Sequence, residues 1–564
     1  MRARLSERLL PFLAWPRPDG KTLARDLVAG LTVSLLAVPQ SMAYAQLAGV
    51  PAYYGLYGAF LPTLIGALFG SSALLSTGPV ALTSLLTAAS VAQVATPGSA
   101  TYFASVTLLA LLSGVMQVAL GLARAGVLLS LLSHPVLVGF INAAALVIIL
   151  SQLPALTGIS LAPTGSLLVD AARLFTHLDA LHPTSTLLGA LAMVMLLALK
   201  RLSPRFPGVL IMVVALTVLS RAIDFGAGGG QIVGTIPTGL PGLSMPSMDW
   251  TAAVALMPAA GVIALVSFTE AMSSCKLIAL RTRTRWDENQ ELIGQGLAKV
   301  TAAFCQSMPV SGSFSRSALN LASHAHSGLS SVFAAGFVLL TLLFLTPLLF
   351  HLPKPALAAM IVVAVANLID VKALRSAWRA SRDDGVAAIL TFAATLLFAP
   401  QIHNGILVGV LFSLGAFIYR RMVPRIVELG RHEDGSLRDL GAERVQPLGE
   451  HMAALRLDAA LFFANVGYFE DAVLKIARDH PKVERILVVA SGINHLDASA
   501  VEMLRALALH LRGHGISLEF CGVKTQVLGV MERTGLVDEI GRERFYASDA
   551  SALAAPTTPV TSAG

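Results

Sequence analysis

Long, uncharged apolar segments recur along most of this 564-residue sequence, from about residue 24 to about residue 420. Two of them are LLALLSGVMQVALGLA at 108–123 and VFAAGFVLLTLLFLTPLLF at 332–350. A helix needs about 20 such residues to cross the hydrocarbon core of a bilayer. Hydrophobic residues make up 55% of the chain and charged residues only 13%. The sequence therefore predicts a polytopic α-helical membrane protein, because the strands of a membrane β-barrel alternate and are shorter.

The placement of positive charge predicts the orientation of the chain in the membrane. The formal net charge is +7, and basic residues gather in a few loops between apolar segments. If the spans number fourteen, these loops lie on the side of the N-terminus, which the positive-inside rule makes cytoplasmic, together with the C-terminus. We therefore expect a cell inner membrane protein, and a nucleic-acid partner is not needed to explain the charge. The clustered residues are Lys200, Arg201, Arg205, Arg281, Arg283, Arg285, Arg375, Arg379, Arg382, Arg420, Arg421 and Arg425.

The composition changes after Arg425. Strand-like and amphipathic helix-like segments alternate from about residue 447, which predicts a soluble α/β domain. The three cysteines do not suggest a disulfide framework. The predicted organisation is a cytoplasmic N-terminal segment without a signal peptide, a transmembrane domain, a linker, the α/β domain and a disordered tail, with bounds 1–23, 24–425, 426–446, 447–549 and 550–564.

The membrane part has two similar halves. A shift of 230 residues roughly overlays AGLTVSLLAVPQSMAYA on AGVIALVSFTEAMSSCK, which is offset by one residue, and sets Gln40 against Glu270. A shift of 234 residues sets Gly78 against Gly312. Seven spans in each half would invert the second copy in the membrane. Inverted repeats with interrupted helices are typical of transporters whose substrate site lies near the membrane midplane.

Two segments, STGPVALTSLL at 76–86 and VSGSFSRSALN at 310–320, place small and hydroxyl residues just before a short apolar run. A helix that begins inside the membrane exposes unpaired N–H groups and attracts anions. Pro79 suits the first position of such a helix, and Gly78 and Gly312 would let a ligand approach the backbone. Hydroxyl donors come from Thr77, Ser311, Ser313 and Ser315. The alternative is close helix packing through small residues.

Two charged residues fall inside apolar segments, where each costs about 3 kcal/mol on insertion scales and is usually functional. Arg316 would either bind the anion or pair with a carboxylate. Glu270 would be that carboxylate, a cation ligand or the group that takes up a proton during transport. These alternatives remain open at this point.

Several long motifs, in order, resemble the sulfate permease family of anion transporters. They include DLVAGLTVSLLAVPQSMAYAQLAGVPAYYGLY at 26–57 and NQELIGQGLAKVTAAFCQSMPVSGSFSRSALN at 289–320, and the resemblance covers nearly the whole chain. The resemblance implies fourteen spans as a seven-plus-seven inverted repeat, a core domain that moves against a gate domain, and a homodimer. It also implies that the α/β domain is a sulfate transporter and anti-sigma factor antagonist (STAS) domain.

The resemblance also implies site residues. The anion site would lie between the third and tenth spans with the first alongside. Glu270 and Ser274 in the eighth span match positions where some relatives hold a coupling sodium ion, although glutamate here favours protons. The implied substrate-binding residues are Gln40, Tyr44, Gly78, Pro79, Val80, Ser313, Phe314, Ser315 and Arg316.

In the α/β domain, NHLDASAVEML resembles the loop that carries the phosphorylated serine of anti-sigma antagonists. Ser499 takes the place of that serine and Asp497 the acidic residue before it. Ala500 replaces the usual glycine after the serine. The alternative, which we favour, is that Asp497 or Ser499 caps the following helix.

The leading hypothesis is secondary active uptake of a small inorganic oxyanion, with sulfate first and proton-coupled symport. Sodium-coupled bicarbonate transport and transport of a C4-dicarboxylate are alternatives. A channel or motor protein is a further alternative, but an uncoupled conductor would not need a titratable group such as Glu270. A STAS signalling scaffold in the membrane is another, but it would have no use for Arg316, Gln40 and Glu270 at membrane depth. We predict no enzymatic activity, cofactor or metal site, since no nucleotide loop, metal-ligand spacing or nucleophile motif is present.

Overall fold

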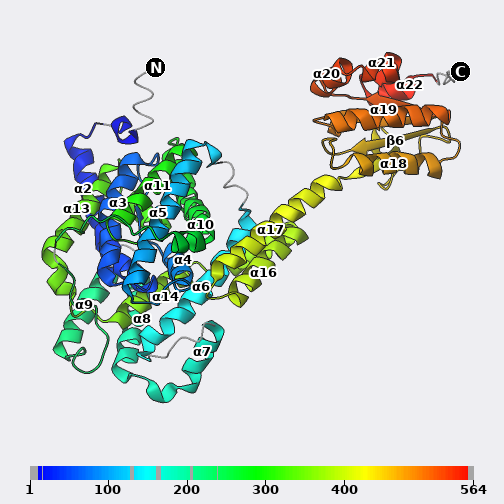
Figure 1. Cartoon of the computed structure of the whole chain (residues 1–564). Helices are drawn as coiled ribbons and strands as arrows, with labels where there is room; N and C mark the ends of the chain where they lie inside the picture. The colour runs from blue at the N-terminus through cyan, green and yellow to red at the C-terminus, as the bar shows by residue number, and fades with distance from the viewer. Residues whose placement is uncertain are drawn as a thin grey trace. The chain divides into compact units, whose positions relative to one another are not determined.

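The computed structural model describes residues 10–15, 17–126, 132–159, 167–202, 208–237 and 239–556. The chain forms two compact units, Met1–Ser413 and Leu414–Gly564 (Figure 1). Arg205, part of the N-terminal segment and the last eight residues of the predicted tail lie outside the described residues.

The first unit is helical. In the described part of the chain, nine helical segments are long and apolar enough to cross a membrane, and two shorter apolar helices accompany them. The predicted count of fourteen spans stays a prediction. The helices of this unit are α2 (Gly20–Leu47), α3 (Ala52–Phe69), α4 (Ala81–Val91), α5 (Ala100–Leu122), α6 (His134–Thr157), α7 (Leu167–Thr176), α8 (Pro183–Leu202), α9 (Gly208–Ala222), α10 (Trp250–Thr282), α11 (Glu288–Phe304), α12 (Phe314–Ala322), α13 (Leu329–Leu340), α14 (Lys354–Ala366), α15 (Val371–Ala380) and α16 (Arg382–Leu397), with α17 (Ile402–Met422) at its end.

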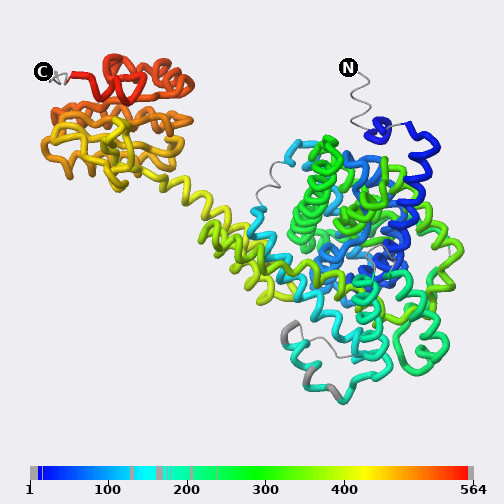
Figure 2. Tube along the Cα trace, turned by 180° about the vertical axis from the view of Figure 1, so that it is seen from behind, coloured from blue at the N-terminus to red at the C-terminus, as the bar shows by residue number. Residues whose placement is uncertain are grey.

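These helices pack as two groups. In the first, α11 packs on α5 and α3, α13 packs on α2, and α10 packs on α5. In the second, α6 packs on α14 and α16, and α8 packs on α14 and α9. The first group mixes both halves of the sequence: helices of the first half, in blue, interleave with helices of the second, in green (Figures 1 and 2). The pairs α2–α13 and α10–α5 have corresponding places in the two halves, as an inverted repeat predicts.

Two short extended segments meet in the first group. Strands β1 (Thr77–Gly78) and β2 (Ser311–Gly312) pair antiparallel, with Thr77 opposite Gly312 and Gly78 opposite Ser311. Helix α4 begins three residues after β1, and α12 begins two residues after β2. The strand pair therefore holds the starts of both short helices close together.

The second unit contains a sheet in the order β4-β3-β6-β7-β8-β9, with β5 on β3; β6 through β9 are parallel. Alternate residues of the central strands face opposite sides. Ala453 and Leu455 pack with α18 to α21, whereas Ala454 packs with α22. The elements are β3 (Ile426–His432), β4 (Leu437–Asp439), β5 (Val445–Gln446), β6 (Met452–Leu457), α18 (Val466–Asp479), β7 (Arg485–Val489), α19 (Ala498–Gly513), β8 (Ser517–Cys521), α20 (Thr525–Arg533), α21 (Leu536–Ile540), β9 (Phe545–Tyr546) and α22 (Asp549–Ala554).

Two predicted boundaries are wrong. The expected linker at 426–446 contains β3, β4 and β5, and β3 pairs directly with β6 in the central sheet. The charged residues of this segment concealed the strand pattern of β3 in the sequence. A strand near the sheet edge needs only some apolar side chains, such as the buried Leu429. The expected tail begins inside α22, whose Ala552 is fully buried against the sheet.

Candidate functional site

The candidate site lies where α4 and α12 begin. Val80 precedes α4 in an extended conformation, and no side chain caps the first turn. Ser313 caps α12 and accepts a hydrogen bond of 3.4 Å from the Arg316 amide. Both helix starts therefore present N–H groups and the positive end of a helix dipole near the β1–β2 pair. Pro79 lies before the N-cap and not at the first helical position that we predicted for it.

Arg316 is buried, with 1% of its surface exposed, and its guanidinium reaches across to the other half of the repeat. Its Nη1 donates to the carbonyl oxygen of Pro79 at 2.9 Å. Its Nη2 has no hydrogen-bond partner among the described residues. A Cβ on Gly78 would lie 3.0 Å from this Nη2, so Gly78 makes room for the guanidinium. Because buried polar groups are normally hydrogen-bonded, this donor is available to an anion.

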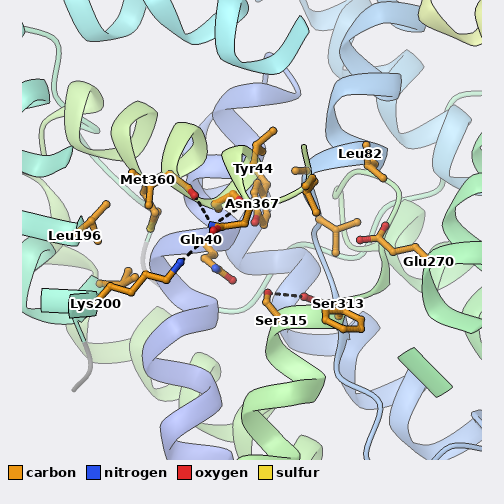
Figure 3. A pocket seen from close by; sticks show the side chains of 18 of the residues that line it. Gln40, Tyr44, Leu82, Leu196, Lys200, Glu270, Ser313, Ser315, Met360 and Asn367 are labelled. Atoms are coloured by element: carbon orange, nitrogen blue, oxygen red, sulfur yellow. Dashed lines mark hydrogen bonds between the residues drawn. The ribbon is translucent and has the colours of Figure 1, made fainter. Parts of the chain in front are cut away.

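A cavity of about 490 Å³ lies at the starts of α4 and α12; the predicted site residues Gly78, Pro79 and Arg316 are not part of its lining. It lies between α2, α4, α10 and α12 of the first helix group and α8, α9 and α14 of the second. Figure 3 shows the side chains of Gln40 and Tyr44 from α2, Glu270 from α10, and Ser313 and Ser315 at the start of α12 around this space. Val80 and Phe314 also line it. Seven of the predicted site residues thus surround one cavity, although they come from four separate segments.

Glu270 and Gln40 each have a buried oxygen atom, Oε2 and Oε1 respectively, with no hydrogen-bond partner among the described residues. The Glu270 carboxylate also interacts electrostatically with Arg316. Ser274 is off the cavity lining, and its hydroxyl donates to the Glu270 carbonyl at 3.1 Å. Ser274 therefore supports the helix that carries Glu270, and its hydroxyl is already used.

Two predicted hydroxyl donors are also engaged by the protein. Thr77 Oγ1 accepts from Gln295 at 2.9 Å, and Ser311 Oγ donates to the Ser267 carbonyl at 2.8 Å. A Cβ on Gly312 would lie 3.0 Å from that of Ala271, so this glycine serves packing and not ligand approach. The extended β1–β2 pair turns these side chains away from the cavity. The sequence could not distinguish them from Ser313 and Ser315, which line the cavity.

The structure adds polar residues that the sequence analysis did not place at the site. Lys200 of α8 and Asn367, which follows α14, line the cavity and form a hydrogen bond of 3.0 Å (Figure 3). Lys299 of α11 is fully buried and donates to Gln117 of α5 at 2.7 Å. In the sequence, Lys299 could have been singled out as a lone lysine inside the apolar α11 segment.

The predicted regulatory residues of the second unit lie at the start of α19. Asp497 is the N-cap, and its carboxylate accepts from the Ala500 amide at 2.9 Å and from the Phe463 amide at 2.8 Å. Ser499 is exposed in the first turn of that helix. The capping interpretation of Asp497 is therefore confirmed. A phosphorylation role for Ser499 stays a prediction.

Two helix groups, the first built from interleaved halves, with a cavity between them at two helix starts, define a multi-pass membrane transporter. The sulfate permease family model matches residues 23–391 and the STAS domain model matches residues 447–552. The chain belongs to the sulfate permease family, whose members are anion transporters and not enzymes. Its second unit is a STAS domain.

Named relatives share most of the length of the chain. It is 34% identical to a probable sulfate transporter 4.2 of Arabidopsis thaliana, over 92% of this chain and 79% of the relative. It is also 34% identical to a probable sulfate transporter of Mycobacterium tuberculosis, over 93% of each chain. Among solved structures, the murine solute carrier 26 family member A9 anion transporter superposes with a TM-score of 0.90 at 24% identity, over 98% of this chain and 94% of that one. This last similarity concerns the fold.

Proposed function

We propose that this protein is a secondary active transporter that takes up sulfate together with protons. The observation that carries the proposal is that unpartnered polar groups gather where α4 and α12 begin, beside one cavity. Arg316 Nη2 has no acceptor among the described residues, and no side chain caps the first turn of α4, although Ser313 already accepts from one amide of α12. A small oxyanion supplies acceptor oxygens on several sides at once and would complete this site.

The position of the cavity supports alternating access. The donors and Glu270 belong to the first helix group, whereas Lys200, Met360 and Asn367 belong to the second group or the loop that follows it. If the first group moves as a core against the second as a gate, the anion would travel with the half-helices that bind it. The named sulfate transporters among the relatives favour sulfate over other oxyanions.

Glu270 is the proposed proton carrier. Its Oε2 is buried and has no hydrogen-bond partner among the described residues, and Glu270 lines the cavity. A proton on this carboxylate would remove a negative charge from the vicinity of the bound anion. Proton and anion would thus favour each other's binding, which is the requirement for symport.

The test is uptake of radiolabelled sulfate into proteoliposomes, with and without an inward proton gradient. Saturable uptake that the gradient accelerates is expected, with little competition from bicarbonate or fumarate. Uptake that requires sodium and is blocked by bicarbonate would favour the sodium-coupled bicarbonate alternative. Efficient fumarate uptake would favour a C4-dicarboxylate. Homodimerisation, an inner-membrane location and cytoplasmic termini also stay predictions.

A further inference from the structure

A second cavity of the transport unit contains none of the predicted site residues. Its volume is about 420 Å³, and it lies where α2 ends and where α3 and α14 begin. Its polar lining includes Gln46 of α2, Tyr53 of α3, Thr235 of the loop before α10 and Lys354 of α14. The described lining contains no Asp or Glu. The charge of Lys354 therefore makes this cavity positive.

The two cavities use opposite ends of the same two helices. Helix α2 lines the first cavity through Gln40 and the second through Gln46. Helix α14 lines the first cavity through Met360 and the second through Lys354, its first residue. These two α14 positions are about 9 Å apart along the helix axis. Since α2 packs on α14, the cavities lie on opposite sides of this helix contact, one after the other along the direction of the helices.

The contact that separates the cavities is made of small side chains. Ala43 and Ala45 of α2 and Ala356 and Ala359 of α14 are all fully buried and belong to one apolar cluster. Small residues let two membrane helices approach each other closely. In this structure the contact closes the path between the cavities. A shift of the first helix group, which contains α2, against the second, which contains α14, would open that path to the second cavity.

Lys354 is held at the second cavity much as Lys200 is held at the first. Lys354 Nζ donates to Gln231 Oε1 at 3.4 Å, and the Lys354 amide donates to the Gln231 carbonyl at 2.9 Å. Lys200 Nζ donates to Asn367 Oδ1 at 3.0 Å. Both acceptors are neutral amide oxygens, so they orient each ammonium group without cancelling its charge.

The position of Lys354 on its helix is not explained by helix stability. A cation at the first residue of a helix lies at the positive end of the helix dipole, which disfavours it. The starts of α3 and α14 follow Pro51 and Pro353, and no side chain caps either of them. The positive ends of two helices and an ammonium group therefore gather at one cavity, and an anion there would stabilise all three.

We propose that the second cavity is the entry site for the transported oxyanion on the side of the membrane opposite Lys200, and that Lys354 captures the anion there. This inference rests on the proposed function. Lys354 attracts a small oxyanion into the cavity while the contact between α2 and α14 is closed. When the first helix group shifts, the anion passes on to the starts of α4 and α12 and to Arg316.

The test measures initial sulfate uptake into right-side-out membrane vesicles at sulfate concentrations below the Michaelis constant. Wild type is compared with Lys354→Gln, Lys354→Arg and the control Arg221→Gln. Arg221 is an exposed residue near the end of α9 and lines neither cavity. We expect Lys354→Gln to lower the ratio of maximal rate to Michaelis constant about tenfold. Lys354→Arg and the control should stay close to wild type.

A charge rescue separates anion capture from packing. The three native cysteines are buried, so Lys354→Cys supplies an accessible thiol on a low background. Two membrane-impermeant thiosulfonate reagents are added outside the vesicles, one that attaches an ammonium group and one that attaches a sulfonate. The ammonium group should restore uptake, the sulfonate should not, and sulfate should slow the labelling. Lys200→Cys should react only from the inside.

Normal uptake by Lys354→Gln, or equal recovery with both reagents, would overturn the inference and leave Lys354 a packing residue. Labelling of Lys354→Cys and Lys200→Cys from the same side would also overturn it. If wild type takes up bicarbonate or fumarate and no sulfate, the sulfate proposal fails. A loss of that uptake in Lys354→Gln, restored by the ammonium reagent on Lys354→Cys, would still support the entry site.

Discussion

Buried charges are treated in opposite ways in the two units of this protein. In the STAS domain, Arg485 and Glu519 on neighbouring parallel strands are each 5% exposed and form a pair with three hydrogen bonds, of 2.9, 3.2 and 2.7 Å. Arg485 also donates to the carbonyls of Ala552 and Ala555. In the transport unit, Arg316 and Glu270 each have a buried polar atom with no hydrogen-bond partner among the residues that the structure describes. The buried charges of the STAS domain are thus fully hydrogen-bonded within the protein, whereas Arg316 and Glu270 keep an atom that a transported ion could bind, as we propose.

The largest effect should follow from Arg316→Ala. The change removes the free guanidinium donor at the half-helix starts, and we expect saturable sulfate uptake to fall to background. Truncating one member of a buried hydrogen-bonded charge pair costs about 2–5 kcal/mol, which is at least about thirtyfold in affinity. Because the change also breaks the hydrogen bond from Nη1 to the Pro79 carbonyl and leaves a cavity, the thermal stability should fall as well, and uptake is therefore measured on correctly folded protein. The control is Arg281→Ala, an exposed arginine near the end of α10. Normal uptake by Arg316→Ala would refute the site assignment.

Glu270→Gln should remove coupling and keep transport. The amide cannot release a proton, so sulfate uptake should no longer respond to a proton gradient, while downhill sulfate exchange persists. Initial rates with and without the gradient measure this. The matched control is Glu291→Gln, a fully buried carboxylate that already accepts four hydrogen bonds, from Ser71, Ser72 and Gln295. Glu291→Gln should lower the thermal stability and keep the response of uptake to the proton gradient. If Glu291→Gln removed that response and Glu270→Gln kept it, hydrogen-bond partners would not distinguish a structural carboxylate from a proton-coupling one.

Arg485→Ala should destabilise the STAS domain and leave the anion site unchanged. Removing one member of a buried pair costs about 3–5 kcal/mol, because Glu519 is left uncompensated. The hydrogen bond to Glu519 raises the pKa of Arg485. The stability that this contributes is fully present below the pKa of the unfolded state and is lost as the pH rises through the pKa of the folded state. The effect should therefore be constant from about pH 6 to about pH 9. Limited proteolysis of the full chain tests this, and a changed sulfate Michaelis constant would contradict it.

The contrast also explains which features were predictable from the sequence. Apolar segments of membrane length, the alternation of strands and helices, and the polar starts of α4 and α12 are local patterns, and each predicted the right kind of element. Glu270 and Arg316 stood out because charge at membrane depth is rare. The family motifs added Gln40 and Tyr44, which no local pattern would have brought to the same cavity.

What the sequence could not supply was the pairing of polar groups. Thr77 and Ser313 are both hydroxyl residues beside a glycine. Thr77 accepts a hydrogen bond from Gln295 and does not line the cavity, whereas Ser313 does, and only the three-dimensional structure shows this difference. Strand β3 was missed because its pairing with β6 is a contact between distant segments, and its charged residues resemble those of a linker. Lys200 was assigned only to a basic loop, because its place at the cavity depends on the packing of α8 against α14.

The smallest expected effect separates structure from regulation in the STAS domain. Asp497→Ala removes the N-cap of α19 and the bond to the Phe463 amide, and should cost about 1 kcal/mol of domain stability. Ser499→Ala alters an exposed hydroxyl one residue before the capped amide of Ala500 and should leave stability unchanged. Thermal unfolding and sulfate uptake of both full-length variants make the comparison. If Ser499→Ala changes the uptake rate while stability is constant, the exposed serine has a regulatory role that capping does not explain; if only Asp497→Ala has an effect, this loop serves the fold.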